Sequence, residues 1–159
     1  MAQHKGKTNQ RLLKWIEERI KAIVNRKKLT NVWKDGGINE EKEYAILTNE
    51  IYKTWSGMTA KQYKEFKGLR KESLRDNMDS LEVTLADIGE EVTKRLAAKK
   101  KPQGLKDNIE VAKRGGLVAK NTRNEIENLL GESVVTSNNK LSYEYTDNKK
   151  IESSNSNDV

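Results

Sequence analysis

Apolar side chains recur every three or four residues through most of the chain, a period that is typical of amphipathic α-helices. The first helix is predicted from Thr8 or Asn9 to Lys28, where polar residues end it. We expect its apolar stripe to face the core of the protein. The members of this stripe are Leu12, Leu13, Ile16, Ile20, Ile23 and Val24.

Capping signals predict two helices in the middle of the chain. Asn39 has the chemistry of an N-cap, and the acidic residues that follow it suit the positive end of a helix dipole. This helix should continue to Trp55. Thr59, with Gln62 three residues later, matches a capping box and predicts a short second helix.

The clearest apolar stripe of the chain follows Asp79, which we predict to be an N-cap. After a basic linker that contains the only proline, Pro102, the spacing of Asp107 and Glu110 predicts the start of a last helix, which ends before Gly131. The stripe after Asp79, which should face the core, consists of Leu81, Leu85, Ile88, Val92 and Leu96.

A pair of glycines, Gly115 and Gly116, lies inside the last predicted helix. Each costs about 1 kcal/mol relative to alanine in a helix interior. Either the helix breaks at this pair, or the backbone of another element packs closely against it. The pair is not a dinucleotide-binding motif, because the required glycine spacing and the preceding strand are absent.

These elements together predict a mainly α fold. We expect one compact multi-helix domain over residues 8–136 and a polar tail over residues 137–159, which we expect to be disordered. Hydrophobic residues make up 34% of the chain and charged residues 35%, which is enough apolar material for one core but not for two.

Composition argues against most enzyme classes and against a membrane protein. The chain has no cysteine and a single histidine, His4, so thiol nucleophiles, thiolate metal sites and histidine-based triads are excluded. The acidic pairs 40–41 and 90–91 would point about 100° apart on a helix, which suits solvent better than a shared metal ion. We therefore expect no enzymatic activity, no catalytic residue, no metal and no cofactor.

No apolar run approaches the ~20 residues of a membrane span, and the lack of cysteine favours the cytoplasm.

Positive charge is concentrated in two blocks. The net charge is +7 over residues 1–28 and +8 over residues 94–123, whereas residues 29–93 and 124–159 each carry −4. This distribution favours attraction to a polyanion such as DNA, although two solvated helix faces would have the same composition. Trp15 and Trp33 lie near basic residues and could stack on bases or belong to the core. The candidate phosphate contacts are Arg11, Lys14, Lys27, Lys28, Lys99, Lys100, Lys101, Lys113, Arg114, Lys120 and Arg123.

An ordered series of short motifs over roughly residues 40–140 resembles the C-terminal half of the DNA-damage-inducible protein D family. Proteins of this family in bacteria and phages often carry an N-terminal BRO-type domain, to which DNA binding is most often assigned; we expect this chain to lack that domain. The resemblance implies a role in DNA damage response, recombination or phage regulation, and no catalytic residue can be carried over from it. The motifs are Tyr44–Asn49, Gly57–Lys61, Lys67–Lys71, Lys101–Leu105 and Ala112–Ala119.

Two functions remain open at this point. The chain could be a non-enzymatic accessory or regulatory protein that binds DNA weakly and without sequence preference through its basic blocks. Alternatively, it could be a protein-binding regulator, such as an antirepressor or an inhibitor of a DNA-processing protein, with no affinity for DNA. A membrane role for the helix over 12–28 is disfavoured by Glu17 and Glu18. Duplex and single-stranded DNA are both candidate ligands at this point, and a monomer and an oligomer are both open.

Overall fold

The computed structural model describes residues 2–141, with side chains from Asn9 onward. These residues form five α-helices and one short 3-10 helix and contain no strand, so the prediction of a mainly α fold is confirmed. The elements are α1 (Ala2–Asp35), α2 (Glu41–Ser56), α3 (Ala60–Phe66), η1 (Arg75–Asn77), α4 (Ser80–Lys100) and α5 (Gly104–Leu130).

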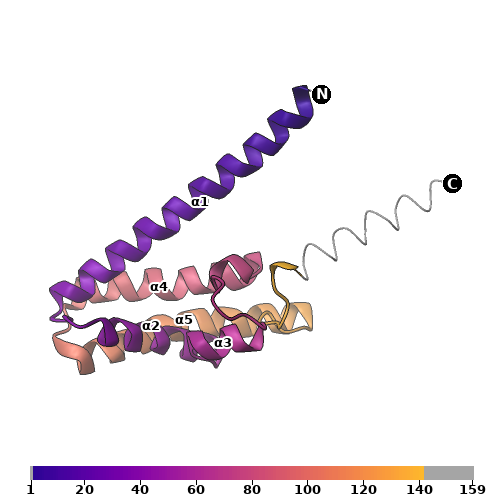
Figure 1. Cartoon of the computed structure of the whole chain (residues 1–159). Helices are drawn as coiled ribbons and strands as arrows, with labels where there is room; N and C mark the ends of the chain where they lie inside the picture. The colour runs from indigo at the N-terminus through magenta and orange to yellow at the C-terminus, as the bar shows by residue number, and fades with distance from the viewer. Residues whose placement is uncertain (1, 142–159) are drawn as a thin grey trace.

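Helices α2, α4 and α5 pack together and enclose most of the core (Figure 1). Helix α5 lies against both α4 and α2, and α3 covers one end of α2. Leu85 is the only fully buried member of the stripe predicted after Asp79; the other four are partly buried. Large side chains at the centre of the core include Leu47, Ile51, Trp55, Tyr63 and Leu85.

The glycine pair of α5 allows helix backbones to approach closely. Helix α5 is unbroken from Gly104 to Leu130, so of the two alternatives the structure shows close packing. A Cβ added at Gly115 would lie 2.0 Å from the Thr93 hydroxyl oxygen and 2.9 Å from the carbonyl oxygen of Gly89 in α4. A Cβ at Gly116 would lie 3.0 Å from the carbonyl oxygen of Ile51 in α2. The two glycines therefore seat α5 between α4 and α2.

Local capping signals are correct at α3 and α4. Both helices begin with a complete capping box, formed by Thr59 with Gln62 and by Asp79 with Glu82. The helix expected after Asn39 is present as α2, but its N-cap was predicted wrongly, because Glu40 rather than Asn39 occupies that position and makes no side-chain hydrogen bond there.

The start of α5 also differs from the prediction, since the helix begins at Gly104, three residues before Asp107. The Asp107 carboxylate still serves the helix terminus, because it accepts a hydrogen bond from the backbone N–H of Gln103 at 3.4 Å.

Helix α1 differs most from the sequence-based expectation. It continues past Lys28 to Asp35, because Leu29 and Trp33 are buried against the rest of the protein and stabilise its last turns. The apolar stripe over residues 12–24, which we expected in the core, is exposed instead. The C-terminal part of α1 packs on α4. Toward its N-terminus α1 diverges from the bundle, so its first turns extend away from the other helices (Figure 1).

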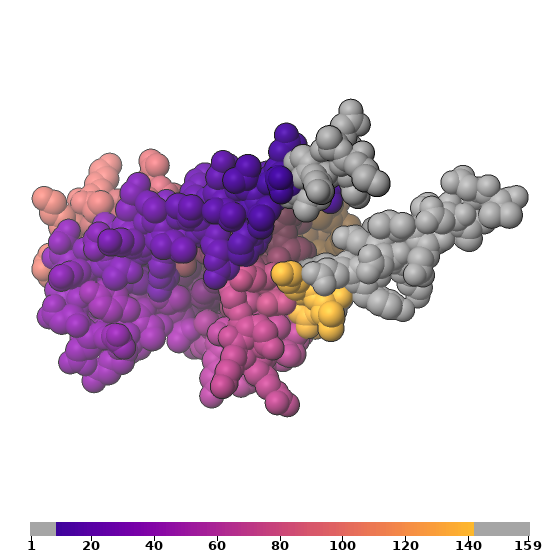
Figure 2. Space-filling model, turned by 45° about the horizontal axis from the view of Figure 1, so that its top comes forward, coloured from indigo at the N-terminus to yellow at the C-terminus, as the bar shows by residue number. Residues whose placement is uncertain are grey.

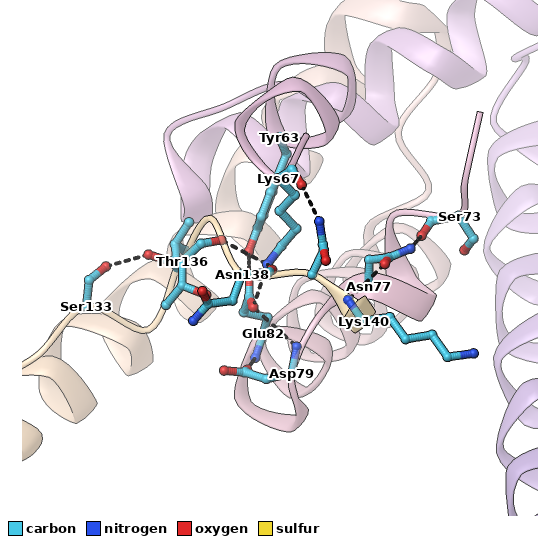
Figure 3. A network of polar contacts seen from close by, with 12 residues as sticks. Tyr63, Lys67, Ser73, Asn77, Asp79, Glu82, Ser133, Thr136, Asn138 and Lys140 are labelled. Carbon is cyan, nitrogen blue, oxygen red and sulfur yellow. Dashed lines mark hydrogen bonds and ion pairs between the residues drawn. The ribbon is translucent and has the colours of Figure 1, made fainter. Parts of the chain in front are cut away.

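A buried polar network joins α3, α4 and the segment after α5 (Figure 3). The Lys67 ammonium group donates to the Glu82 carboxylate at 3.0 Å and to the carbonyl oxygens of Thr136 and Asn138 at 2.8 Å and 2.6 Å. The Tyr63 hydroxyl also donates to Glu82. Burial and this hydrogen bond to Glu82 raise the pKa of the Tyr63 phenol well above its usual range. The network thus neutralises a buried charge while fixing three separate segments.

The same network places the first residues of the expected polar tail on the domain. The Asn139 side chain donates to the carbonyl oxygen of Lys67, and the backbone N–H of Lys140 donates to the Asn77 side chain. Val134 and Val135 are buried just before this segment. Contacts with the domain thus continue to Lys140, which lies within the segment expected to be the tail. The remainder of the predicted tail, residues 142–159, lies outside the described residues.

Candidate nucleic-acid interface

The turn after α1 and the linker before α5 are hydrogen-bonded to each other at one end of the molecule. The backbone N–H of Gly104 donates to the carbonyl oxygen of Gly36 at 2.8 Å. The buried Asn108 side chain donates to the carbonyl oxygens of both glycines, at 2.8 Å to Gly104 and at 3.4 Å to Gly36. A Cβ added at Gly36 would lie 2.9 Å from the carbonyl oxygen of Pro102, so only a glycine allows this approach without rearrangement. These contacts connect the two basic blocks of the sequence.

We call the basic residues around this junction the basic end. The last turns of α1, the C-terminus of α4 and the first turn of α5 contribute to it, and all of its side chains are exposed. Within residues 9–141 no salt bridge neutralises any of them. The basic end consists of Lys27, Lys28, Lys34, Lys99, Lys100, Lys101 and Lys106.

Two members of the basic end were missed in the sequence. Lys34 was not selected because the first helix was expected to end at Lys28, whereas it continues to Asp35. Lys106 was not selected because it stands apart from the lysine cluster in the linker. The signal in the sequence that could have identified Lys106 was its position beside Asp107, in the first turn of the helix that directly follows the lysine cluster.

Helix α5 extends the positive charge along its exposed face. Lys106, Lys113 and Lys120 are all exposed, and their seven-residue spacing aligns them along one side of the helix. Lys113 approaches Glu110 at 3.8 Å, an exposed pair that contributes little to stability. Arg114 and Lys100 both line a shallow cavity of about 230 Å³ beside the linker. This cavity also contains Asp107 and Glu110, so its walls carry both signs of charge.

The basic residues at the start of α1 lie far from the basic end. Arg11 and Lys14 are exposed on the part of the helix that diverges from the bundle. At 1.5 Å per residue they are roughly 20–25 Å along the helix axis from Lys28. The structure therefore separates these two candidate contacts from those at the basic end.

Arg123 has a structural role that the sequence did not reveal. Its guanidinium group donates to the carbonyl oxygens of Trp55 and Ser56, both at 3.1 Å, and pairs with Glu127 at 3.0 Å. It thus satisfies carbonyl groups at the C-terminus of α2. Because these contacts occupy the guanidinium group, we remove Arg123 from the candidate phosphate contacts.

The two tryptophans have different environments. Trp33 is fully buried, which excludes stacking on a nucleobase. Trp15 is 49% exposed, and the Arg19 guanidinium lies 5.5 Å from its ring centroid. Only Trp15 therefore remains available for stacking.

A second cavity, of about 530 Å³, lies beneath α1 and is lined by charged residues of both signs. Arg26 of α1 pairs with Glu90 at 3.0 Å, and Arg75 pairs with Glu90 at 3.3 Å and with Asp87 at 2.5 Å. Burial lowers the pKa of Arg75, but these carboxylates more than offset that effect and keep it above its usual value. These four residues balance one another's charges, and the pair of Arg26 with Glu90 holds α1 on the bundle.

The described residues contain neither a candidate metal site nor a helix that could span a membrane. In the part of the chain that the structure describes, no group of three or more acidic, histidine or cysteine side chains could hold a metal ion. No helix in that part is both long and apolar enough to cross a membrane.

A known domain family matches most of the chain. The family model described as the DinD C-terminal domain matches residues 8–143, which is most of the chain. Neither a curated protein nor a solved structure shows significant similarity to the chain.

Proposed function

The chain belongs to the DinD C-terminal domain family, and from this premise we propose that it is a non-enzymatic, DNA-associated accessory or regulatory protein. The family name associates it with DNA damage. We propose that the chain acts in the cytoplasm and binds the phosphate backbone of DNA weakly and without sequence preference.

The observation that supports this proposal best is the hydrogen bond between Gly104 and Gly36. It joins the turn that lies eight residues after the first basic block to the middle of the second block, so that seven exposed lysines from α1, α4 and α5 lie around one junction. Lys28 is only about 12 Å along the α1 axis from Gly36. Their fields therefore add at this end, where the nearby acidic residues include Asp35, Asp107 and Glu110.

Lysine side chains suit contacts with phosphate rather than with bases. An ammonium group on a flexible stem neutralises a phosphate and releases a bound counterion, which gives affinity without reading sequence. The basic end is built entirely from lysines, and most of them lie at helix ends. Arg114 of α5 and the lysines at positions 113 and 120 would extend the same contact along the backbone.

The test is fluorescence anisotropy with labelled duplex and single-stranded DNA of random sequence at about 50 mM salt. The variant Lys99→Gln/Lys100→Gln/Lys101→Gln removes three members of the basic end. We expect the affinity of this variant for DNA to be roughly tenfold or more below that of the wild type, and the loss to be about the same for every sequence.

The matched control is Lys42→Gln/Lys53→Gln/Lys61→Gln, which removes the same charge from exposed positions on α2 and α3. We expect this control to bind nearly as well as the wild type. Equal losses in both variants would mean that net charge, and not the basic end, sets the affinity.

A second candidate function is that of a protein-binding regulator, such as an antirepressor or an inhibitor of a DNA-processing protein. The observation that favours it is the exposed apolar stripe of α1, which is unusual for a surface that meets only solvent. The two functions are compatible, because the stripe and the basic end occupy different parts of the protein.

A further inference from the structure

The apolar stripe of α1 has no partner among the residues that the structure describes. Its side chains are between 37% and 60% exposed, although all of them are large and aliphatic. Figure 2 shows α1, in indigo and purple, crossing the face of the protein that is turned toward the viewer. The stripe consists of Leu12, Leu13, Ile16, Ile20, Ile23 and Val24.

The stripe is exposed because a different side of α1 faces the bundle. Arg19 bonds Asp76, Arg26 bonds Glu90, and Trp33 is buried, and the seven-residue spacing of these three residues defines one side of the helix. At 100° per residue, the centre of the stripe lies about 100° around the helix from that side. Leu12, seven residues before Arg19, lies on the same side as Arg19 but in the turns that diverge from the bundle. Burying the stripe against its own bundle would require α1 to rotate and to break both ion pairs.

The spacing within the stripe is that of a helix-pairing seam. Leu13, Ile16, Ile20 and Ile23 follow one another at intervals of three, four and three residues, which corresponds to the a and d positions of two heptads. The stretch from Asn9 to Asp35 contains neither glycine nor proline and is helical throughout. A continuous helix with such a seam is shaped to pack along a second helix.

The charges beside the seam are mostly positive; Glu17 is the one acidic residue on the edge that carries the exposed lysines, so the net charge of that edge is positive. Lys14, Lys21 and Lys28 are exposed and, again at seven-residue spacing, form a row along one edge of the stripe. Between residues 9 and 141 no salt bridge involves any of the three. On the opposite edge, Arg19 and Arg26 are already paired with carboxylates of the bundle. A helix that docks on the stripe therefore meets uncompensated positive charge on its outer side.

We propose that the α1 stripe docks an acidic amphipathic helix of a partner protein. The apolar seam of that helix would cover the four aliphatic seam residues, and its flanking Asp or Glu side chains would pair with the lysine row. This proposal gives the second candidate function its type of partner and does not depend on DNA binding.

Charge disfavours a second copy of α1 as the occupant. Residues 9–28 contain seven basic and two acidic residues, so two copies would bring together helices of net charge +5 each. The next seam position after Ile23 is Lys27, which would face its own copy in a parallel pair. Against an acidic helix, the same lysine would meet a carboxylate.

The experiment uses the full chain and a labelled synthetic peptide whose helix has a leucine and isoleucine seam flanked by glutamates. A second peptide, identical except for lysines at the flanks, tests the charge argument. We expect the acidic peptide to bind at least tenfold more tightly than the basic one. Ile16→Ser/Ile20→Ser should weaken its binding at least tenfold, whereas the control Leu129→Ser, at a side chain of α5 that is 80% exposed, should not.

The lysine row is tested with the variant Lys14→Gln/Lys21→Gln/Lys28→Gln, which should bind the acidic peptide more weakly and with less dependence on salt.

Equal affinity for the two peptides, or unchanged affinity in the serine variant, would overturn the proposal. So would a wild-type dimer in sedimentation that the serine variant converts to a monomer, since a second copy would then cover the stripe. Binding of the wild type to anionic lipid vesicles, lost in the serine variant, would assign the stripe to a membrane surface. DNA affinity, measured on the serine variant, should stay unchanged, so this test and that of the basic end can fail separately.

Discussion

Lys67 and Glu82 form an ion pair with 3.0 Å between Nζ and Oε1, and both side chains are fully buried. The pair joins the C-terminus of α3 to the first turn of α4, and Lys67 also holds two carbonyl oxygens of the segment after α5 (Figure 3). Because neither charge reaches solvent, each depends on its neighbours for compensation.

Glu82→Gln should lower the free energy of unfolding by about 3–5 kcal/mol, because it leaves the Lys67 charge buried without its carboxylate. Urea denaturation measures this loss. The double variant Lys67→Met/Glu82→Leu should lose clearly less stability than the sum of the losses measured for Lys67→Met and for Glu82→Leu alone. Strict additivity of the single changes would show that the pair is not energetically coupled.

Leu85 and Ile20 should respond very differently to truncation, although both belong to apolar stripes of the sequence. Leu85 is fully buried, so Leu85→Ala should destabilise the protein by about 2–5 kcal/mol. Ile20 is 56% exposed, so Ile20→Ala should change stability by no more than about 0.5 kcal/mol. Thermal unfolding of both variants checks the placement of α1; a large loss for Ile20→Ala would mean that its stripe is covered.

Gly115→Ala should destabilise the protein by about 1–3 kcal/mol, even though alanine is the better helix former. The added methyl group would overlap Thr93 Oγ1 and press on the backbone of α4. Asn121→Ala, at an exposed position on the same helix, should be neutral or slightly stabilising.

The combination Gly115→Ala/Thr93→Ala tests the cause of that loss. It should recover only part of the stability, because the carbonyl oxygen of Gly89 and the backbone nitrogen of Thr93 remain within 2.9 Å of the new methyl group. Complete recovery would assign the whole effect to the Thr93 side chain.

Stability should fall between pH 10 and pH 12 because of Tyr52. Burial and the nearby negative charge of Glu90 raise the pKa of Tyr52 from 10.0 to about 12. In this window the unfolded chain loses the phenolic proton while the folded protein keeps it, so unfolding is favoured by up to about 2–3 kcal/mol. Denaturation at several pH values should show a shallower decline for Tyr52→Phe than for the wild type. Identical profiles would contradict the burial of this phenol.

Most features that depend on neighbours in sequence were predicted correctly, although the N-cap expected at Asn39 was not. The capping boxes at Thr59 and Asp79 involve residues three positions apart, so the local sequence is sufficient to define them. The glycine pair in α5 likewise indicated either a break or a close approach, and the approach of Thr93 and Gly89 provides the reason.

Features that depend on distant residues were not predictable in the same way. The stripe of α1 showed that the helix has an apolar face but did not show what covers that face. Its orientation is set by Arg19 with Asp76 and by Arg26 with Glu90, pairs that lie 57 and 64 residues apart. Arg123 was chosen for its charge, whereas its carbonyl partners lie 67 and 68 residues away. The junction at Gly36 and Gly104, which creates the basic end, is equally long-range.

The most direct test of the account is the salt dependence of binding to random-sequence duplex DNA. The logarithm of the affinity should fall linearly with the logarithm of salt concentration, with a slope of about −0.9 for each phosphate neutralised. The variant Lys99→Gln/Lys100→Gln/Lys101→Gln should give a slope shallower by roughly two to three units. A wild-type slope near zero, or an unchanged slope in this variant, would contradict the assignment of DNA binding to the basic end.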